Sequence, residues 1–472
     1  MKAAIIGGGV IGGGWAARFL LNGWDVAVSD PDPDAGRKIE AVLQNARASL
    51  PHLYERNLPK EGTLSYCASI AKAVDGADWV QESVPERLEM KHQVLADIQA
   101  ASGDAIVGSS TSGFKPSQLQ EGACNPGHIL VAHPFNPVYL LPLVELVPSA
   151  RTSRSVVKRA HEILKSVGFH PLEVRAEIDA HIADRFLEAV WREALWLIKD
   201  DIATTQEIDD AIRYGFGLRW AQMGLFETYR IAGGEAGMRH FIDQFGPCLS
   251  WPWTKLMDVP ELTDALAQKI ADQSDAQSGG HSIRELERLR DENLVVMLRA
   301  LKARDWGAGK TFADHEKSLA PAPGGADTAL LRTVARVVPN DWVDYNGHMN
   351  ESRYGQVFSD AADDVLARIG GDADYVASGF SFFTVDIHIK FVLETHVGQS
   401  IYVETQVIEG AGKKLRLFHW MRAEDGTLLA TGAQLLLHVS LTTRKSCVPD
   451  GDVGAKLVEI AASHAHLPDP TT

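Results

Sequence analysis

The chain has 472 residues, of which 45% are hydrophobic, and it carries a formal net charge of −16 with an isoelectric point near 5.5. This length suits roughly two to four domains, each large enough to bury a core. An acidic surface argues against nucleic acids and membranes as partners, and no apolar run approaches the ~18 residues that span a bilayer. The four scattered cysteines lack metal-ligand spacing, which favours reduced thiols in the cytoplasm and no metal site.

Residues 1–176 alternate strand and helix patterns, which predicts a doubly wound α/β domain of the Rossmann type. A short apolar run before a glycine cluster is typical of a buried parallel strand, and a helix at 16–21 follows it. The predicted strands are 2–6, 24–29, 79–80, 105–108, 129–132 and 143–147.

Residues 177–318 have a different character, because apolar residues recur at helical spacing from Ile182 to Ile198 and no clear strand follows. We therefore expect an all-helical second domain for substrate binding and dimerisation. Its further predicted helices are 209–214, 262–271 and 283–304. Most of its many aromatic rings are expected in the core.

A Pro/Ala/Gly-rich linker is predicted at 319–328, before a third domain at 329–445. The third domain has a strand at 331–338, one long helix at 354–369, and then four strand patterns, an order that predicts an α+β hotdog fold. Those four strands are 380–391, 400–409, 415–422 and 428–440. The last part, 446–472, is expected to be a mobile tail.

A dinucleotide fingerprint, G-x-G-x-x-G, lies between the first predicted strand and helix, and Asp30 ends the second strand. Glycines allow a tight turn and close approach of a pyrophosphate, and the acidic residue accepts hydrogen bonds from the adenosine ribose. The residues after Asp30 add no cation for a 2′-phosphate, which favours NAD over NADP. The alternative is a glycine-rich turn without a ligand. The predicted cofactor contacts of the turn are Gly7, Gly9, Val10, Ile11 and Gly12.

His133 and Glu145 lie twelve residues apart, in a loop after one strand and in the next strand. A carboxylate bonded to one imidazole nitrogen fixes the tautomer, so that the other nitrogen can take a proton from an alcohol while hydride leaves its carbon. The alternative is that the two residues serve only packing or surface charge.

Three motifs that occur in order make residues 1 to about 315 resemble the 3-hydroxyacyl-CoA dehydrogenase family. Glu82 to Glu86 with Lys91 resembles the family's E-x-x-x-E…K segment, the run from Ser109 to Gly113 resembles its S-N-T-S-S loop, and His133-Pro-Phe-Asn-Pro137 resembles its H-F-F-N-P motif.

This resemblance implies that Glu86 and Lys91 face the cofactor and that Ser112 lies near the substrate hydroxyl. It also implies that His133 is the general base and that Glu145 orients it. Taken singly, Glu86 and Lys91 could be surface charges and Ser112 a turn hydroxyl.

Asp184 marks a departure from that family, which has an Asn in an N-R-L context where this chain has Asp184-Arg-Phe. A carboxylate near the substrate disfavours an anion and favours a cation, and aromatic faces hold quaternary ammonium groups. We expect Phe135 and Phe216 to be the pocket aromatics. The alternative is that Asp184 pairs with a surface arginine such as Arg185.

The run D-Y-N-G-H-M-N, which begins at Asp344, resembles the 4-hydroxybenzoyl-CoA thioesterase group of hotdog enzymes, and the resemblance covers about 330–445. It implies that Asp344 is the hydrolytic carboxylate and that Gly347, His348 and Asn350 form the turn before the hotdog helix. The helix N-terminus can hold a developing oxyanion. Glu351 is a second carboxylate at this point, and a mere helix-capping loop is the alternative.

The two resemblances together are similar to fused enzymes of carnitine metabolism. They imply NAD-dependent oxidation of L-carnitine to 3-dehydrocarnitine and hydrolysis of betainyl-CoA to glycine betaine and CoA. The alternatives are an L-3-hydroxyacyl-CoA or sugar-acid dehydrogenase with a general acyl-CoA thioesterase, or with a non-catalytic acyl-CoA-binding or dimerisation module. Since relatives of both parts dimerise, we expect a homodimer.

Overall fold

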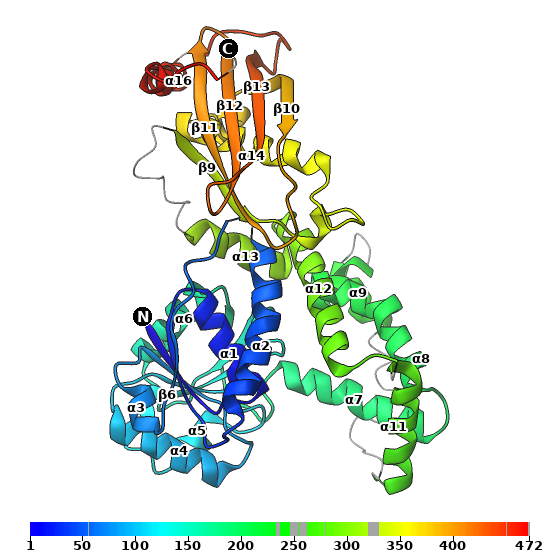
Figure 1. The fold of residues 1–472 in the computed structure, drawn as a ribbon. Coiled ribbons are helices and arrows are strands. Elements are labelled where there is room, and N and C mark those ends of the chain that lie inside the picture. Colours follow the sequence, from blue (N-terminus) through cyan, green and yellow to red (C-terminus); the bar gives the residue numbers. More distant parts are fainter. Residues whose placement is uncertain are drawn as a thin grey trace. The chain divides into compact units, whose positions relative to one another are not determined.

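The structure is a computed structural model (Figure 1), and it describes residues 1–54, 56–232, 237–245, 254, 261, 263–278, 280–319, 330–449 and 451–470. The chain forms two compact units, one of residues 1–50 with 60–315 and one of residues 51–59 with 316–472. Of the predicted linker, all but Leu319 lies outside the described residues. Within the described parts, no helix is both long and apolar enough to cross a membrane.

The first unit is built on an eight-stranded sheet of order β3-β2-β1-β4-β5-β6-β7-β8. The strands from β1 to β6 are parallel, β7 runs antiparallel to β6, and β8 runs parallel to β7. This confirms the predicted Rossmann architecture, although the short strands β3 and β8 were not predicted. The strands are β1 (Lys2–Ile6), β2 (Asp25–Ser29), β3 (Leu64–Tyr66), β4 (Trp79–Glu82), β5 (Val107–Ser109), β6 (Ile129–Pro134), β7 (Leu143–Val147) and β8 (His170–Glu173).

Helices cover both faces of this sheet (Figure 1). Apolar side chains of α3, α4 and α5 share one core with the strands, and α1 contacts β1 and β2. Parallel strands buried in this way require near-continuous apolar sequence, which is what made them recognisable. The helices are α1 (Val10–Leu21), α2 (Ala35–Ser49), α3 (Ile70–Val74), α4 (Leu88–Ala101), α5 (Pro116–Leu119) and α6 (Arg154–Ser166).

The remainder of the first unit is helical in its described parts, as predicted. A buried hydrogen bond of 2.5 Å from the Tyr139 hydroxyl to Asp291 joins α12 to the sheet domain. The expectation that most aromatic rings of this region are core is wrong for Trp191, Tyr214 and Phe226, whose side chains are exposed. The elements are α7 (Ala183–Lys199), α8 (Thr205–Ala211), the π-helical turn η3 (Ile212–Phe216), α9 (Gly217–Ala232), α10 (Gly237–Phe245), α11 (Asp264–Ser278), α12 (Ile283–Lys302) and α13 (Gly307–Ser318), which extends past residue 315 into the second unit.

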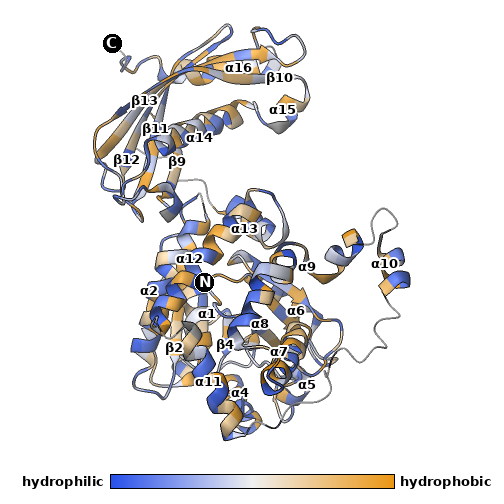
Figure 2. Ribbon diagram, turned by 90° about the vertical axis from the view of Figure 1, so that its right-hand side faces the viewer, coloured by the Kyte–Doolittle hydropathy of each residue, from blue (hydrophilic) through white to orange (hydrophobic). Residues whose placement is uncertain are grey.

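The second unit contains a five-stranded antiparallel sheet of order β10-β13-β12-β11-β9, with α14 along one face (Figures 1 and 2). The α14 side chains Val357 and Phe358 share a core with Val403 and Met421 of the sheet. This is the predicted hotdog arrangement. Its elements are β9 (Leu331–Val337), α14 (Glu351–Ile369), α15 (Ala373–Ala377), β10 (Phe380–Phe391), β11 (Ser400–Ala411), β12 (Lys414–Ala423) and β13 (Leu428–Ser440).

The predicted mobile tail instead contains α16 (Gly451–His464), so that expectation is wrong for this stretch. Val453 and Leu457 are buried in a core cluster with α14 and the sheet. The Nδ1 atom of His464 accepts a hydrogen bond of 2.9 Å from the backbone N–H of Val407, at an irregularity of β11. Both contacts tie the segment to the sheet.

Residues 51–59 belong to the second unit although they lie early in the chain. The backbone N–H of Arg56 donates to the Glu316 carboxylate at 3.1 Å, and the Arg56 guanidinium donates to the carbonyl of Leu319 at 3.2 Å. The second unit is therefore assembled from two separate stretches of sequence.

Candidate active sites

The glycines of the fingerprint form a tight turn between β1 and α1. A Cβ atom on Gly12 would lie 1.8 Å from the carbonyl oxygen of Gly7, and one on Gly7 would lie 2.6 Å from that of Ser83. Gly7 also has a φ of +101°, a conformation that favours glycine. A Cβ on Gly9 would meet nothing within 4 Å. Two glycines thus close the turn, and the third leaves its outer side open for a ligand.

A cavity of about 1190 Å³ lies against this turn. Asp30 lines it and accepts hydrogen bonds from the backbone N–H groups of Gly8, at 2.5 Å, and Asp32, at 2.7 Å. Lys38, which the sequence reasoning missed, also lines the cavity and pairs with Asp32 at 2.5 Å. The predicted cofactor residues that line the cavity are Gly7, Gly9, Val10, Ile11 and Asp30. Gly12 does not line it and instead packs closely against the Gly7 carbonyl within the turn.

Glu86 and Lys91 belong to a polar network instead of lining that cavity, with Lys91 buried and Glu86 partly exposed. The Lys91 ammonium contacts the Glu82 carboxylate at 3.0 Å and the Glu86 carboxylate at 3.2 Å. Thr111 donates its hydroxyl to Glu86, and the Gly113 N–H donates to it at 3.1 Å. Burial raises the pKa of Glu86, but these donors and the Lys91 charge outweigh it and hold that pKa below its usual range. The network fixes the loop after β5, and direct contact with a cofactor stays a prediction.

His133 and Glu145 are direct cross-strand neighbours in the antiparallel pair β6–β7. The Nδ1 atom of His133 lies 3.1 Å from Glu145 Oε2, and its Nε2 atom lies 3.2 Å from the Ser112 hydroxyl. Glu145 is fully buried, and its other oxygen accepts the N–H groups of Ile182 and Ala183 at 2.9 and 3.0 Å. Burial raises the pKa of Glu145, but the bonds from His133 and those two amides outweigh it and lower that pKa. The carboxylate therefore stays charged and holds the ring.

Asp184, in the first turn of α7, lies on the other side of the same imidazole. Its Oδ2 atom is 3.5 Å from His133 Nε2, and its side chain is 20% exposed. Burial raises the pKa of Asp184, and the Glu145 charge adds to this, while His133 acts in the opposite direction. The ion contact that the structure gives this carboxylate is thus to His133 and not to Arg185.

His181 is a residue of this site that the sequence reasoning missed. Its ring is fully buried 5.5 Å from the His133 ring, and its Nε2 atom bonds the Thr111 carbonyl oxygen at 3.2 Å. Burial lowers the pKa of His181. Of the predicted aromatics, Phe135 lies edge-on to His133 at 4.9 Å, whereas Phe216 contacts Trp220 at 4.6 Å. A place for Phe216 in the substrate pocket stays a prediction.

In the second unit, the predicted turn leads into α14. The Asp344 carboxylate accepts the backbone N–H groups of Asn346, at 2.8 Å, and His348, at 3.3 Å, and Gly347 takes a φ of +78° between them. Asn350 caps α14 by accepting the N–H of Ser352 at 3.0 Å. The bond from Asn346 is the main reason why the pKa of Asp344 is lowered, so this carboxylate stays ionised.

A cavity of about 510 Å³ lies at the start of α14. It is lined by both candidate carboxylates, Asp344 and Glu351, and by the polar side chains of His348 and Asn350. The wall opposite comes from Phe391 to Glu394, and the Tyr354 hydroxyl donates to the buried Thr395 hydroxyl at 3.0 Å. An ionised carboxylate and a helix N-terminus therefore meet in a cavity that is partly apolar.

Comparison with known families matches each part of the chain. Residues 2–178 match "3-hydroxyacyl-CoA dehydrogenase, NAD binding domain", and residues 181–272 match "3-hydroxyacyl-CoA dehydrogenase, C-terminal domain". Residues 337–457 match the "Thioesterase-like superfamily". The chain is thus an enzyme with a dehydrogenase part and a thioesterase part.

Similar proteins of known name cover the whole chain or its first part. An L-carnitine dehydrogenase/betainyl-CoA thioesterase of Ruegeria pomeroyi is 63% identical over 99% of this chain and 97% of its own length. An L-carnitine dehydrogenase of Mesorhizobium japonicum is 58% identical over 68% of this chain and 89% of its own. Among solved structures, an NAD⁺-dependent FHMPC 5-dehydrogenase is 26% identical, with a TM-score of 0.54 over 64% of this chain and 98% of its own.

Proposed function

The chain belongs to the family of L-carnitine dehydrogenase/betainyl-CoA thioesterases, and from this premise we propose that it oxidises L-carnitine to 3-dehydrocarnitine with NAD⁺ and hydrolyses betainyl-CoA to glycine betaine and CoA. The assignment of the substrate rests on the Asp184 carboxylate, which lies 3.5 Å from His133 Nε2. The residues around this contact have separate roles in the oxidation.

His133 is the general base of the oxidation. Because the Nδ1–H of His133 donates a hydrogen bond to Glu145 at 3.1 Å, the Nε2 lone pair is free to take the proton of the substrate hydroxyl. The Ser112 hydroxyl, 3.2 Å from Nε2, lies where that substrate oxygen has to bind and positions it. NAD⁺, when bound, accepts the hydride that leaves the carbon bearing this hydroxyl. Glu145 and Asp184 stabilise the positive charge that the ring gains in this step.

Asp184 selects a cationic substrate. In L-carnitine the trimethylammonium nitrogen is attached to the carbon next to the one that bears the hydroxyl. A hydroxyl bound to His133 Nε2 therefore brings the cation within about 5 Å of Asp184, a separation at which a partly buried ion pair is worth a few kcal/mol. Phe135, edge-on to the same imidazole, offers an aromatic face for the methyl groups. The CoA ester of a simple 3-hydroxy acid has no cation for this carboxylate.

NAD is the proposed cofactor in preference to NADP. Asp30 occupies the cavity at the end of β2, and the positive charge of Lys38 is paired with Asp32 at 2.5 Å. A 2′-phosphate would meet two carboxylates there, whereas a ribose hydroxyl would find acceptors. The open side of Gly9 leaves room for the pyrophosphate at the start of α1.

Asp344 is the proposed carboxylate of thioester hydrolysis. It stays ionised, so it can take a proton from water as that water attacks the thioester carbonyl. The developing oxyanion is held at the N-terminus of α14, and the C–S bond then breaks to release the CoA thiolate, which takes up a proton. Glu351 lines the same cavity but is exposed at the helix start, where it complements the helix dipole.

We also infer a homodimer, located in the cytoplasm. The exposed face of α7 carries Phe186, Leu187 and Trp191, and β10 is an edge strand with exposed Val385 and Phe391. Both are apolar surfaces that a second copy can cover. The described cysteines are free thiols, as expected in a reducing compartment. Analytical ultracentrifugation of the purified chain at several concentrations tests the assembly, and a monomer throughout would contradict it.

The substrate proposal is tested by following NADH formation with L-carnitine and with L-3-hydroxybutyryl-CoA at matched concentrations. We expect a higher kcat/KM for L-carnitine. Preference for the CoA ester would instead support a hydroxyacyl-CoA dehydrogenase. Thiol release from betainyl-CoA, compared with acetyl-CoA and a longer acyl-CoA, tests the second activity. No release from any thioester would leave the hotdog domain as a binding or dimerisation module.

A further inference from the structure

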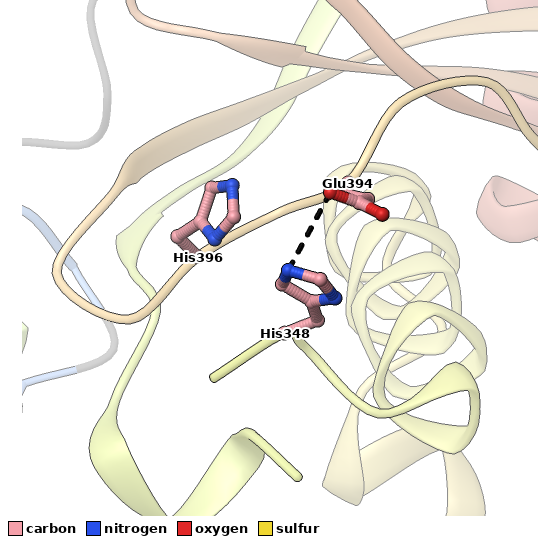
Figure 3. A group of neighbouring side chains, drawn as sticks. All are labelled: His348, Glu394 and His396. Carbon is pink, nitrogen blue, oxygen red and sulfur yellow. Dashed lines mark ion pairs between the residues drawn. The ribbon is translucent and has the colours of Figure 1, made fainter. Parts of the chain in front are cut away.

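Three side chains at the rim of the thioesterase cavity form a cluster that neither proposed reaction uses. They are His348, Glu394 and His396, and they are drawn in Figure 3. Each offers one ligand atom, and these atoms all lie within 4.8 Å of one another. His348 Nε2 is 3.4 Å from the Glu394 carboxylate, and the two imidazole rings are 4.9 Å apart. The cysteine spacing predicted no metal site, and Glu394 lies 46 positions after His348 in the sequence.

The backbone, and not chance side-chain positions, brings these groups together. His348 and His396 are paired residues of an antiparallel bridge, which places their side chains next to each other. Glu394 and His396 are two residues apart, and the ligand atoms of both lie within 4.8 Å of that of His348. Thr395 between them points the other way, where its buried hydroxyl accepts from Tyr354 at 3.0 Å and its carbonyl accepts the N–H of Met349 at 2.7 Å.

Both chain segments that carry the cluster are held in place. The His396 N–H donates to the Gln399 side chain at 3.0 Å, and the His348 N–H donates to Asp344 at 3.3 Å. The ligand side chains themselves are open to water, since the Glu394 side chain is 69% exposed. A fixed backbone with accessible side chains gives an ion both a preformed site and an entry path.

We propose that this cluster, the rim triad of His348, Glu394 and His396, binds a divalent transition metal ion of the Zn²⁺ or Co²⁺ type. Two imidazoles and one carboxylate suit these ions, and not Mg²⁺ or Ca²⁺, which prefer oxygen ligands. Metal bonds of about 2.0–2.1 Å place tetrahedral ligands roughly 3.4 Å apart. The His348–Glu394 pair already has that separation, at 3.4 Å. The exposed His396 ring completes the set by a small rotation, and the fourth position takes water.

The test is titration of the purified full-length protein with Co²⁺, followed by visible absorption and by calorimetry. We expect one ion per chain with a spectrum of nitrogen and oxygen ligation, distinct from the intense charge-transfer bands of thiolate ligation. His396→Gln and Glu394→Gln should each weaken that site by about tenfold or more. His388→Gln is the matched control, because His388 is an exposed histidine of the same unit outside the triad, and it should leave binding unchanged.

Two results would overturn the proposal. One is an unchanged affinity and spectrum in His396→Gln and Glu394→Gln, which would assign the bound ion to other surface groups. The other is no binding to the unsubstituted protein at millimolar Co²⁺, which would leave the His348–Glu394 contact as a plain ion pair. Thermal unfolding of each metal-free variant, measured beside the parent protein, shows whether a loss of binding reflects a loss of fold. A variant that binds less while unfolding at the parent temperature supports the proposal.

Discussion

Replacing Asp184 with Asn should selectively weaken the use of a cationic substrate. The change keeps the shape of the side chain and removes its charge 3.5 Å from His133 Nε2. A substrate hydroxyl hydrogen-bonded to Nε2 places the trimethylammonium nitrogen about 5 Å from this carboxylate. At an effective dielectric constant of about 20, two unit charges at that distance attract by about 3 kcal/mol.

Solvent reduces this attraction, because the Asp184 side chain is 20% exposed. We therefore expect a loss of about 1–2 kcal/mol, which corresponds to a fall of roughly 5- to 30-fold in kcat/KM for L-carnitine. The sign of the pH dependence follows from the raised pKa of Asp184, whose main cause is burial. As the pH falls through that raised pKa, the carboxyl becomes neutral and KM for L-carnitine rises. The Asp184→Asn protein should lack this rise.

The assay is NADH formation with L-carnitine and with 3-hydroxy-5,5-dimethylhexanoate, in which a carbon atom replaces the quaternary nitrogen. The two substrates have the same shape but differ in charge. Asp184→Asn should lower the preference for L-carnitine over this analogue, which keeps the carboxylate but lacks the cation. An equal loss with both substrates would refute the electrostatic argument and would show that Asp184 acts by positioning His133.

Three further outcomes are expected. His133→Ala should abolish oxidation and leave thioester hydrolysis intact, and Asp344→Ala should do the reverse; loss of both activities from either change would contradict separate sites. Glu145→Gln should lower kcat by about 100-fold or more, because an amide can offer its N–H to Nδ1 and stabilise the wrong tautomer; a near-normal kcat would exclude the orienting role. His419 is fully buried, which lowers its pKa to about 4, so acid should destabilise the second unit by about 2 kcal/mol between pH 7 and pH 5. This destabilisation begins as the pH falls below the pKa of His419 in the unfolded state, near 6.5, and it levels off below the pKa in the folded state. The His419→Gln protein should show a smaller destabilisation when denaturant unfolding is measured at both pH values.

The elements predicted best from the sequence were those whose limits carry a local signal. The bounds of β7, β10 and β13 coincide with the predicted 143–147, 380–391 and 428–440, because uninterrupted β-type patterning filled each strand. Strands β3 and β8 are three and four residues long, too short for a periodic pattern. The α16 segment was wrongly predicted to be mobile because its end is polar and contains proline, although two of its apolar residues are buried against the sheet and α14.

Within the candidate sites, the sequence predicted neighbours along the chain better than neighbours in space. His133 and Glu145 lie in adjacent strands, so a contact between them could be expected. The burial of His181 beside His133 depends on how the chain enters α7, and the position of Lys38 over the cavity depends on the packing of α2. Neither leaves a pattern in the sequence. The rim triad was missed for the same reason, because a bridge between two loops creates it.

The contribution of residues 51–59 to the second unit bears on where the chain can be cut without loss of structure. If the thioesterase were simply appended, a fragment beginning near residue 316 should retain everything that its fold needs. Arg56 instead donates hydrogen bonds to Glu316 and to Leu319, so such a fragment would lose both partners at its first residues. The first residues of the thioesterase part are therefore bonded to a segment from inside the dehydrogenase sequence. A cut just before residue 316 would separate the two enzyme parts and would also remove both of these hydrogen bonds.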